Sequence, residues 1–290
     1  LRKFLPDHMV PAGFAVPFSF YDRFMKSNGL YKAAEEMMAN DEFKTNPEVR
    51  QKALKTFRKR FKKLPVPDDI MEALGRAQAA FPENHPIRCR SSTNNEDLEG
   101  FNGAGLYDSS THREDEGHLA NTVKKVWRSL WNFRAFEERD FYRIDHAVAA
   151  MGVLMHPNFD DELSNGVAVT KHIYDPRMPG YYVNVQVGEA LVTNPDAGAT
   201  PDEFIIVHMA SEKEPYVVQT IRKSNLNGGQ PVMQKKNLDL LVEAMYSIQY
   251  HFKKEVYRRP RSDTSFAMDI EFKEDANGAL VIKQARPWVD

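Results

Sequence analysis

The spacing of apolar residues predicts that the chain is mainly helical up to about residue 80. Between Val49 and Leu64, apolar residues recur every three or four positions, so they share one face of a helix. Asn46-Pro47 marks the start of that helix, because asparagine caps free backbone N–H groups and proline suits the first helical position. We expect two further helices, one capped by Ser19 and running through residue 26, and one over 68–80.

Short apolar stretches typical of strands dominate after residue 86. The predicted strands span residues 87–90, 152–155, 166–170, 181–187, 204–208 and 216–221. One long helix over 118–146 interrupts them, and another over 238–256 follows them. Helices followed by short antiparallel strands indicate an α+β fold class rather than a regular βαβ alternation. Such a sheet leaves one face free to form a ligand cleft.

A hairpin over residues 266–287 is predicted at the end of the chain. Residues 266–272 and 280–286 alternate as two strands, and Asp275-Ala276-Asn277-Gly278 between them indicates a tight turn. In this register Glu274 faces Ala279, and Asp269 lies opposite Gln284. Alternation then places four polar side chains on one face of the hairpin, namely Asp269, Glu271, Gln284 and Arg286.

These four residue types suit a divalent metal bound together with a polyphosphate. Carboxylate and amide oxygens are hard ligands for Mg²⁺, and a guanidinium offers phosphate oxygens a planar fork of donors. The alternative is a solvated outer face with a surface ion pair.

Composition is typical of a soluble globular protein that works in a reducing compartment. Of the 290 residues, 42% are hydrophobic and 28% are charged, and the net charge of −2 favours neither nucleic acid nor anionic membranes as partners. No apolar run has the length of a membrane span, and no signal peptide is visible. The single cysteine, Cys89, excludes an internal disulfide and fits the cytoplasm; we expect it to be buried. Because the chain starts at Leu1, we expect it to be a fragment.

Two further patterns can be interpreted either as ordinary solvated surface or as functional sites. Residues 50–63 contain eight Lys or Arg and no acid, which predicts a solvated helix face, with phosphate or RNA contact as the alternative. Arg90-Ser91-Ser92-Thr93 begins a polar loop with glycines at 100, 103 and 105, which either folds over phosphates or is an ordinary surface loop. It matches neither the P-loop nor the dinucleotide-binding motif.

Several blocks, in order along nearly the whole chain, resemble the nucleotide-binding domain of the phosphoenolpyruvate synthase and pyruvate phosphate dikinase family. The blocks are Cys89-Arg90-Ser91-Ser92-Thr93 with Glu96-Asp97-Leu98, Ser129-Leu130-Trp131-Asn132-Phe133-Arg134-Ala135, Tyr142-Arg143, residues 165–170, Gly188-Glu189, and Asp269-Ile270-Glu271-Phe272 with Gln284-Ala285-Arg286-Pro287. The resemblance implies an ATP-grasp fold, in which two lobes close on ATP. The N-terminal lobe would span 1–150 with a phosphate-binding loop over 90–105, and the C-terminal lobe would span 151–290.

The resemblance also implies a role for individual residues. Arg90 and Arg286 would bind the triphosphate of ATP, Thr170 would contact phosphate, and Glu189 would lie at the nucleotide cleft. Glu271, Gln284 and Asp269 would hold Mg²⁺, and the hinge that binds adenine would lie near Met155. The catalytic set implied in this way is Arg90, Arg286 and Asp269.

The activity that the family implies is transfer of a phosphoryl group from Mg·ATP to a histidine on a separate swivelling domain, and finally to pyruvate on a substrate domain. Three parts of the family pattern are absent from this chain: a glycine- and lysine-rich loop that would precede Leu1, the phosphohistidine domain and the substrate domain. We expect His112, in Ser110-Thr111-His112-Arg113, to be a surface loop residue rather than the phosphorylated histidine. Other acceptors (a glucan, water or an antibiotic) and a non-catalytic nucleotide-binding module are the alternatives.

Overall fold

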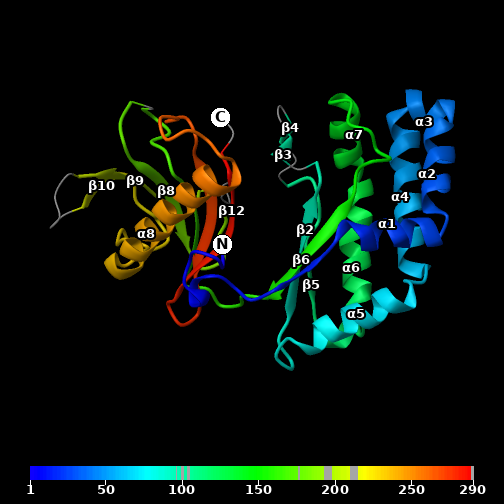
Figure 1. Ribbon diagram of the computed structural model, residues 1–290, viewed down its shortest axis with the longest axis horizontal. Coiled ribbons are helices and arrows are strands. Elements are labelled where there is room, and N and C mark those ends of the chain that lie inside the picture. The colour runs from blue at the N-terminus through cyan, green and yellow to red at the C-terminus, as the bar shows by residue number, and fades with distance from the viewer. Residues whose placement is uncertain are drawn as a thin grey trace. The chain divides into compact units, whose positions relative to one another are not determined.

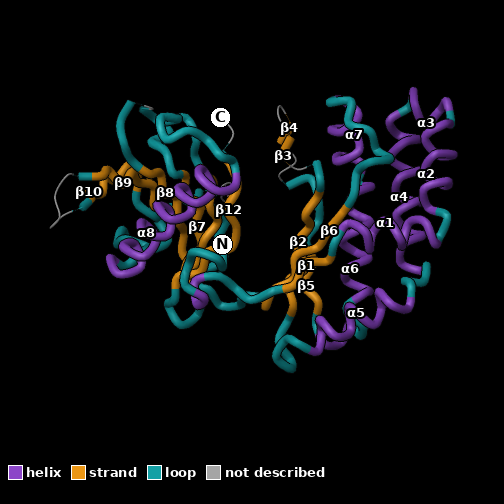
Figure 2. Tube along the Cα trace, viewed as in Figure 1, coloured by secondary structure: helices purple, strands orange, loops and turns teal. Residues whose placement is uncertain are grey.

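The computed structural model describes residues 1–95, 97–98, 101–102, 105–175, 177–192, 198–209 and 215–288, and the fold is shown in Figures 1 and 2. The chain forms two compact units, one made of Ala12–Asn158 and the other of Leu1–Pro11 with Phe159–Asp290. The division therefore falls after Asn158 and not after residue 150, because the strand Met151–Pro157 pairs with strands of the first unit. Residues 1–11 belong to the second unit, which the sequence pattern did not indicate.

The N-terminal half of the Ala12–Asn158 unit is helical, as predicted. Its helices are α1 (Phe18–Ser27), α2 (Leu30–Ala39), α3 (Asp41–Thr45), α4 (Pro47–Lys63) and α5 (Asp68–Ala79). The Asn46 cap is confirmed, since its side-chain oxygen accepts hydrogen bonds from the backbone N–H groups of Glu48 and Val49. The Ser19 cap is wrong, because α1 already begins at Phe18 behind Pro17 and has no side-chain cap. Most of the basic side chains of α4 are exposed, as expected for a solvated face.

A four-stranded antiparallel sheet lies beside these helices, with strand order β1-β6-β2-β5. Its strands are β1 (Phe14–Val16), β2 (Ile87–Thr93), β5 (Ser110–His112) and β6 (Met151–Pro157), and a small ribbon joins β3 (Asp97–Leu98) to β4 (Phe101–Asn102). The helices of this unit cover one face of the sheet (Figure 2). The core between them holds aromatic side chains such as Phe24, Trp127 and Trp131.

The long helix expected over 118–146 is broken into three pieces. They are α6 (Ala120–Trp127), a 3-10 turn (Arg128–Trp131) and α7 (Phe133–Phe141). The break occurs because Asn132 adopts an extended backbone conformation, with φ −61° and ψ 141°. The turn before it still buries Trp131, whose indole N–H donates to the Tyr21 hydroxyl at 3.0 Å.

The second unit is built on a six-stranded antiparallel sheet, with strand order β10-β9-β8-β7-β11-β12. The strands are β7 (Ser164–Val169), β8 (Tyr181–Val187), β9 (Asp202–His208), β10 (Tyr216–Arg222), β11 (Met268–Glu274) and β12 (Leu280–Pro287). Helix α8 (Lys235–His251), extended by a π-helical turn (Phe252–Val256), covers one face of this sheet (Figure 1). Leu5, Met9 and Val10 of the N-terminal segment join the same core, and Asp7–Met9 forms a short 3-10 helix. The α+β fold class is confirmed.

Candidate functional site

In the hairpin of β11 and β12, two acidic residues of one strand each lie directly opposite a polar residue of the other strand. Asp269 pairs with Arg286, and Glu271 pairs with Gln284. The predicted pairings of Glu274 with Ala279 and of Asp269 with Gln284 are therefore wrong, since Glu274 pairs with Leu280. A bulge between Glu271 and Phe272 then shifts the register by one more residue, because Lys283 is an extra residue on β12. The bulge keeps the four polar residues on one face while Ile270 and Phe272 stay in the core under α8.

An ion pair fixes the position of Arg286 on this face. Both Nε and Nη2 of Arg286 lie 2.9 Å from Oδ2 of Asp269. The two side chains are only 24% and 15% exposed, so the pair is largely shielded from water. Glu271 has a looser cationic neighbour, since Lys283 Nζ lies 3.8 Å from its Oε2. The two carboxylates are thus held differently.

Two rows of directly opposed residues continue from the hairpin acids across the sheet, and the row from Asp269 is formed by a buried hydrophobic cluster. Glu271 is followed across the strands by Val167, Asn184 and Glu203, and Asp269 is followed by Val169, Tyr182 and Ile205. Asn184 is buried, and its side-chain oxygen has no hydrogen-bond partner among the described residues. Sequence reasoning missed Asn184 and Glu203, although alternation over 181–187 places Tyr182, Asn184 and Gln186 on one face.

Glu203 anchors the far end of the first row. Its carboxylate accepts hydrogen bonds from the hydroxyls of Tyr174 and Tyr182 and from Nε of Arg222 at 2.6 Å. Burial alone would raise the pKa of Glu203, but the hydrogen bonds from Tyr174 and Arg222 outweigh burial and lower it. Glu203 is therefore ionised at neutral pH and holds the loop that carries Tyr174 against the sheet.

The other predicted residues of this unit lie at opposite ends of its strands. Thr170 directly follows β7, next to the Asp269 row, and its buried hydroxyl accepts a hydrogen bond from the Met268 N–H at 2.9 Å. Glu189 is exposed in the turn after β8. Val187 at the end of β8 pairs with Ser164, which lies three residues from Val167, so this turn is about 10 Å along the strand from the Glu271 row.

Arg90 and Met155 belong to the sheet of the other unit. Arg90 lies on β2 opposite Leu154, and the preceding Cys89 lies opposite Met155. Cys89 and Met155 both face the helical core, and burial raises the pKa of the Cys89 thiol to about 12, as expected for an unreactive cysteine. Arg90 therefore projects from the face that the helices leave open, whereas the Met155 side chain does not. Part of the predicted loop over 90–105, including Gly100 and Gly103, lies outside the described residues.

The prediction that His112 is a surface loop residue is wrong. His112 lies on β5, opposite Ile87, and its side chain is buried. Its Nδ1 lies 2.9 Å from the Thr122 hydroxyl, and its Nε2 lies 3.2 Å from Nε2 of Gln78. Burial lowers the pKa of His112, so the imidazole is neutral and structural.

The hairpin face fits a magnesium ion that is shared with phosphates rather than one held in a protein cage. Within the described ranges, no three His, Cys, Asp or Glu side chains gather as a metal cluster. Mg²⁺ in nucleotide sites commonly takes one or two carboxylates and completes its shell with phosphate oxygens and water. Glu271 and Gln284, which face each other across the strands, offer that kind of partial ligand set.

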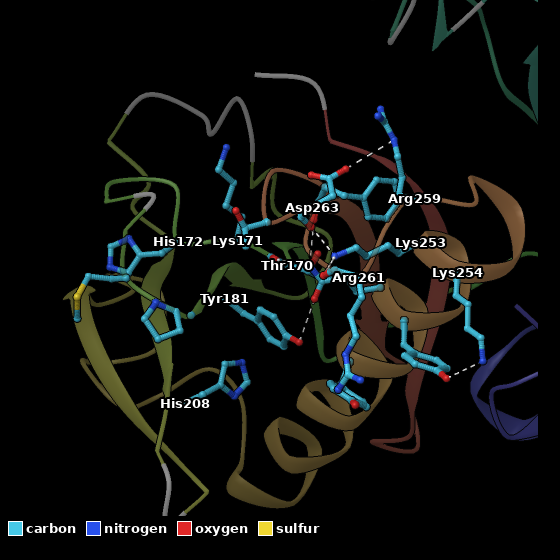
Figure 3. Close-up of a pocket in the computed structure, with 18 of the residues that line it drawn as sticks. Thr170, Lys171, His172, Tyr181, His208, Lys253, Lys254, Arg259, Arg261 and Asp263 are labelled. Atoms are coloured by element: carbon cyan, nitrogen blue, oxygen red, sulfur yellow. Dashed lines mark hydrogen bonds and ion pairs between the residues drawn. The ribbon is translucent and has the colours of Figure 1, made fainter.

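A separate cavity of about 930 Å³ opens beside the C-terminal end of α8 (Figure 3). It is bordered by residues 170–172 and 177–181, by His208 of β9, and by residues 246–266 of α8 and the following loop. Of the predicted site residues, Thr170 is the one that lines it, and the four hairpin residues do not.

Comparison with known proteins identifies the class of domain that carries this site. Residues 6–289 match the family described as "Pyruvate phosphate dikinase, AMP/ATP-binding domain". The chain therefore belongs to that family, and the predicted resemblance is confirmed.

The individual relatives share about a quarter of their aligned residues with this chain. Phosphoenolpyruvate synthase of Aeropyrum pernix is 24% identical over 96% of this chain and 38% of its own length. Rifampicin phosphotransferase of a Streptomyces species is 28% identical over 50% of this chain and 17% of its own length. The chain thus spans well under half the length of these relatives. Among solved structures, D-alanyl-alanine synthetase A of Vibrio cholerae aligns with a TM-score of 0.34 and 8% identity over 76% of this chain and 47% of its own.

None of the described helices combines the length and the apolar character that a membrane-spanning segment needs.

Proposed function

We propose that this chain is the ATP-binding domain of a dikinase-type phosphotransferase. In this proposal, a phosphoryl group passes from Mg·ATP to a histidine on a separate domain of the full-length protein, and then to pyruvate to give phosphoenolpyruvate. Family membership and the relative named phosphoenolpyruvate synthase support the proposal. The observation that carries it is the hairpin face, where Asp269–Arg286 and Glu271–Gln284 stand side by side as direct cross-strand pairs.

In the proposed mechanism the residues position the nucleotide and neutralise its charge, because phosphoryl transfer needs little covalent help from the protein. Arg286, already oriented by Asp269, would hold phosphate oxygens through its fork of donors, and Arg90 of the other unit would do the same. Glu271 and Gln284 would hold Mg²⁺, which neutralises charge on the phosphates when bound. Asp269 would act by orienting Arg286, and the roles of Thr170, Glu189 and Met155 remain those that the family implies.

A labelling experiment on the full-length protein tests the proposal. Incubation with Mg²⁺ and ATP labelled in its phosphates should give an enzyme-bound phosphate that is labile in acid and stable in base, as a phosphohistidine is. Glu271→Gln should slow its formation about 10²–10³-fold, judged from comparable electrostatic losses in other enzymes. Labelling of that variant at nearly the normal rate would refute the role of Glu271.

A different final acceptor is the second candidate. It is favoured by the matches to rifampicin phosphotransferases, whose name states an antibiotic acceptor. The same labelling experiment separates the two candidates, because the labelled full-length protein would pass its phosphate to added pyruvate in one case and to an added antibiotic, a glucan or water in the other. A chain that binds ATP and never becomes labelled would instead be a non-catalytic nucleotide-binding module.

A further inference from the structure

The cavity beside α8 is lined mainly by cations and aromatic rings. Six lysines and arginines border it against one carboxylate, that of Asp263. The six are Lys171, Arg177, Lys253, Lys254, Arg259 and Arg261. Such an excess of positive charge around a hollow of about 930 Å³ costs electrostatic free energy unless an anion enters.

This cavity lies on the other side of the sheet from the hairpin acids. Tyr181, which borders it, points into the core under α8, and so do Met268 and Ile270 on β11. Asp269 alternates with those two residues and therefore faces the opposite side. A ligand in this cavity would be a second ligand, bound apart from the nucleotide at the hairpin face.

The walls of the cavity are held in place by hydrogen bonds. Nε2 of Gln249 on α8 donates to the carbonyl oxygens of Thr170 and Phe266, both at 3.1 Å. Lys253 donates to the carbonyl oxygens of Arg261 and Asp263, which pins the loop after α8. The cavity is thus shaped before any ligand arrives.

Some of the lining cations are already used in internal contacts. Arg177 forms a two-pronged pair with Asp175 at 2.9 Å, and Arg259 lies 3.8 Å from Asp263. For Arg261, no carboxylate lies within ion-pair distance in the described part of the chain, and its side chain extends from the loop toward the space that Tyr181 and His208 border (Figure 3). A guanidinium in this position can offer its donors to an incoming anion.

The opposite wall adds polar and aromatic groups. His208 packs edge-on against Tyr181, with ring centroids 4.4 Å apart, and its buried Nε2 has no hydrogen-bond partner among the described residues. Tyr246 and Tyr250 stack on each other and remain largely exposed.

We propose that this cavity binds a small phosphate-bearing molecule, with Arg261 as its main anchor. Several cations around one hollow favour a multiply charged phosphate over a single carboxylate, which would leave most of the positive charge unbalanced. The proposal does not depend on the chemistry assigned to the hairpin face.

Pyrophosphate binding to the full-length protein, measured by calorimetry, tests this site. All measurements use a background with Arg90→Ala and Arg286→Ala, because those two arginines are the proposed phosphate ligands of the nucleotide site. Pyrophosphate should still bind this background, and adding Arg261→Ala should weaken that binding about 10- to 100-fold, as expected for the loss of a charge-assisted hydrogen bond. Arg261 is exposed, so its replacement should leave the melting temperature unchanged.

The matched control is Lys236→Ala, which removes one exposed positive charge from α8 outside the cavity. This variant should bind pyrophosphate as the background does. If Lys236→Ala and Arg261→Ala weaken pyrophosphate binding equally, the effect comes from the total charge of the protein and not from the cavity, which overturns the proposal. The absence of pyrophosphate binding in the background would also overturn it. Labelling by ATP, measured with Arg261→Ala alone, should be normal, so failure of this site and failure of the proposed function give different results.

Discussion

The two carboxylates of the hairpin face have different partners, and we infer different roles from that difference. The Asp269 carboxylate lies 2.9 Å from the Arg286 guanidinium, whereas Glu271 pairs across the strands with Gln284 and lies 3.8 Å from the Lys283 ammonium. A carboxylate held by a guanidinium orients that guanidinium, and a carboxylate opposite an amide shares with it the oxygen ligands that Mg²⁺ prefers.

Arg286→Lys should weaken the binding of Mg·ATP by the full-length protein about tenfold. Lysine keeps the positive charge, but it cannot offer two parallel donors to a phosphate or hold the same contact with Asp269. Calorimetric titration with a non-hydrolysable ATP analogue measures the effect. Arg60→Lys, on an exposed face of α4, is the control and should bind normally. Normal affinity of Arg286→Lys would remove this arginine from the phosphate site.

The buried position of His146 predicts that the folded protein loses stability in acid. It stacks on Phe136 and accepts a hydrogen bond from Arg139, and burial followed by the nearby Arg139 lowers its pKa from 6.5 to about 4. Between these two pH values the unfolded chain binds a proton that the native state does not, so this histidine reduces stability as the pH falls from 6.5 to 4, by at most about 3 kcal/mol.

Urea unfolding at pH 7, 5 and 4 measures the loss of stability. His146→Gln keeps an acceptor for Arg139 without a titrating ring, so its stability should fall less steeply over this range. Parallel curves for the two proteins would show that the buried imidazole is not responsible.

Alternation within the hairpin was enough to predict its four polar residues from the sequence. Asn184 and Glu203 could not be found in the same way. They lie in one row with Glu271 only because β11 pairs with β7, β7 with β8 and β8 with β9. The order of strands in an antiparallel sheet is a long-range property, and local periodicity does not contain it.

At the scale of elements, the caps of two helices give a matched pair of substitutions. Asn46→Ala should lower the free energy of unfolding by about 1 kcal/mol, because two backbone N–H groups at the start of α4 lose their acceptor. Ser19→Ala should have almost no effect, because the exposed Ser19 side chain lies inside α1 and caps nothing. Equal losses in urea unfolding would contradict this assignment of the caps.

The elements that were predicted wrongly share a physical cause. Apolar spacing alone could not show that the helix over 118–146 breaks at Asn132, since the inward-facing residues continue through the 3-10 turn. Turn chemistry in the final hairpin predicted the turn over residues 275–278 but the wrong register, because Ala279 stays outside the strand pairing and the bulge at Lys283 leaves no clear mark in the alternation of β12. Both errors concern single residues that interrupt otherwise regular periods.

At the scale of the whole molecule, the sequence predicted the fold class and a division into two parts. The structure places the boundary after Asn158 instead of residue 150. β6 belongs with β1 and β2 by its hydrogen bonds, and Leu5, Met9 and Val10 of the N-terminal segment join the core under α8. The family match covers both units.

The measurement that tests this account most directly is thermal unfolding of the full-length protein with ATP, in the presence and absence of Mg²⁺. If the hairpin face binds a magnesium nucleotide, ATP at 100 times its dissociation constant should stabilise the protein by about 2.7 kcal/mol in the presence of Mg²⁺. The stabilisation should shrink when Mg²⁺ is removed, and it should shrink to the same extent in Glu271→Gln with Mg²⁺ present. A shift that is independent of Mg²⁺, or one that Glu271→Gln leaves intact, would contradict the central claim.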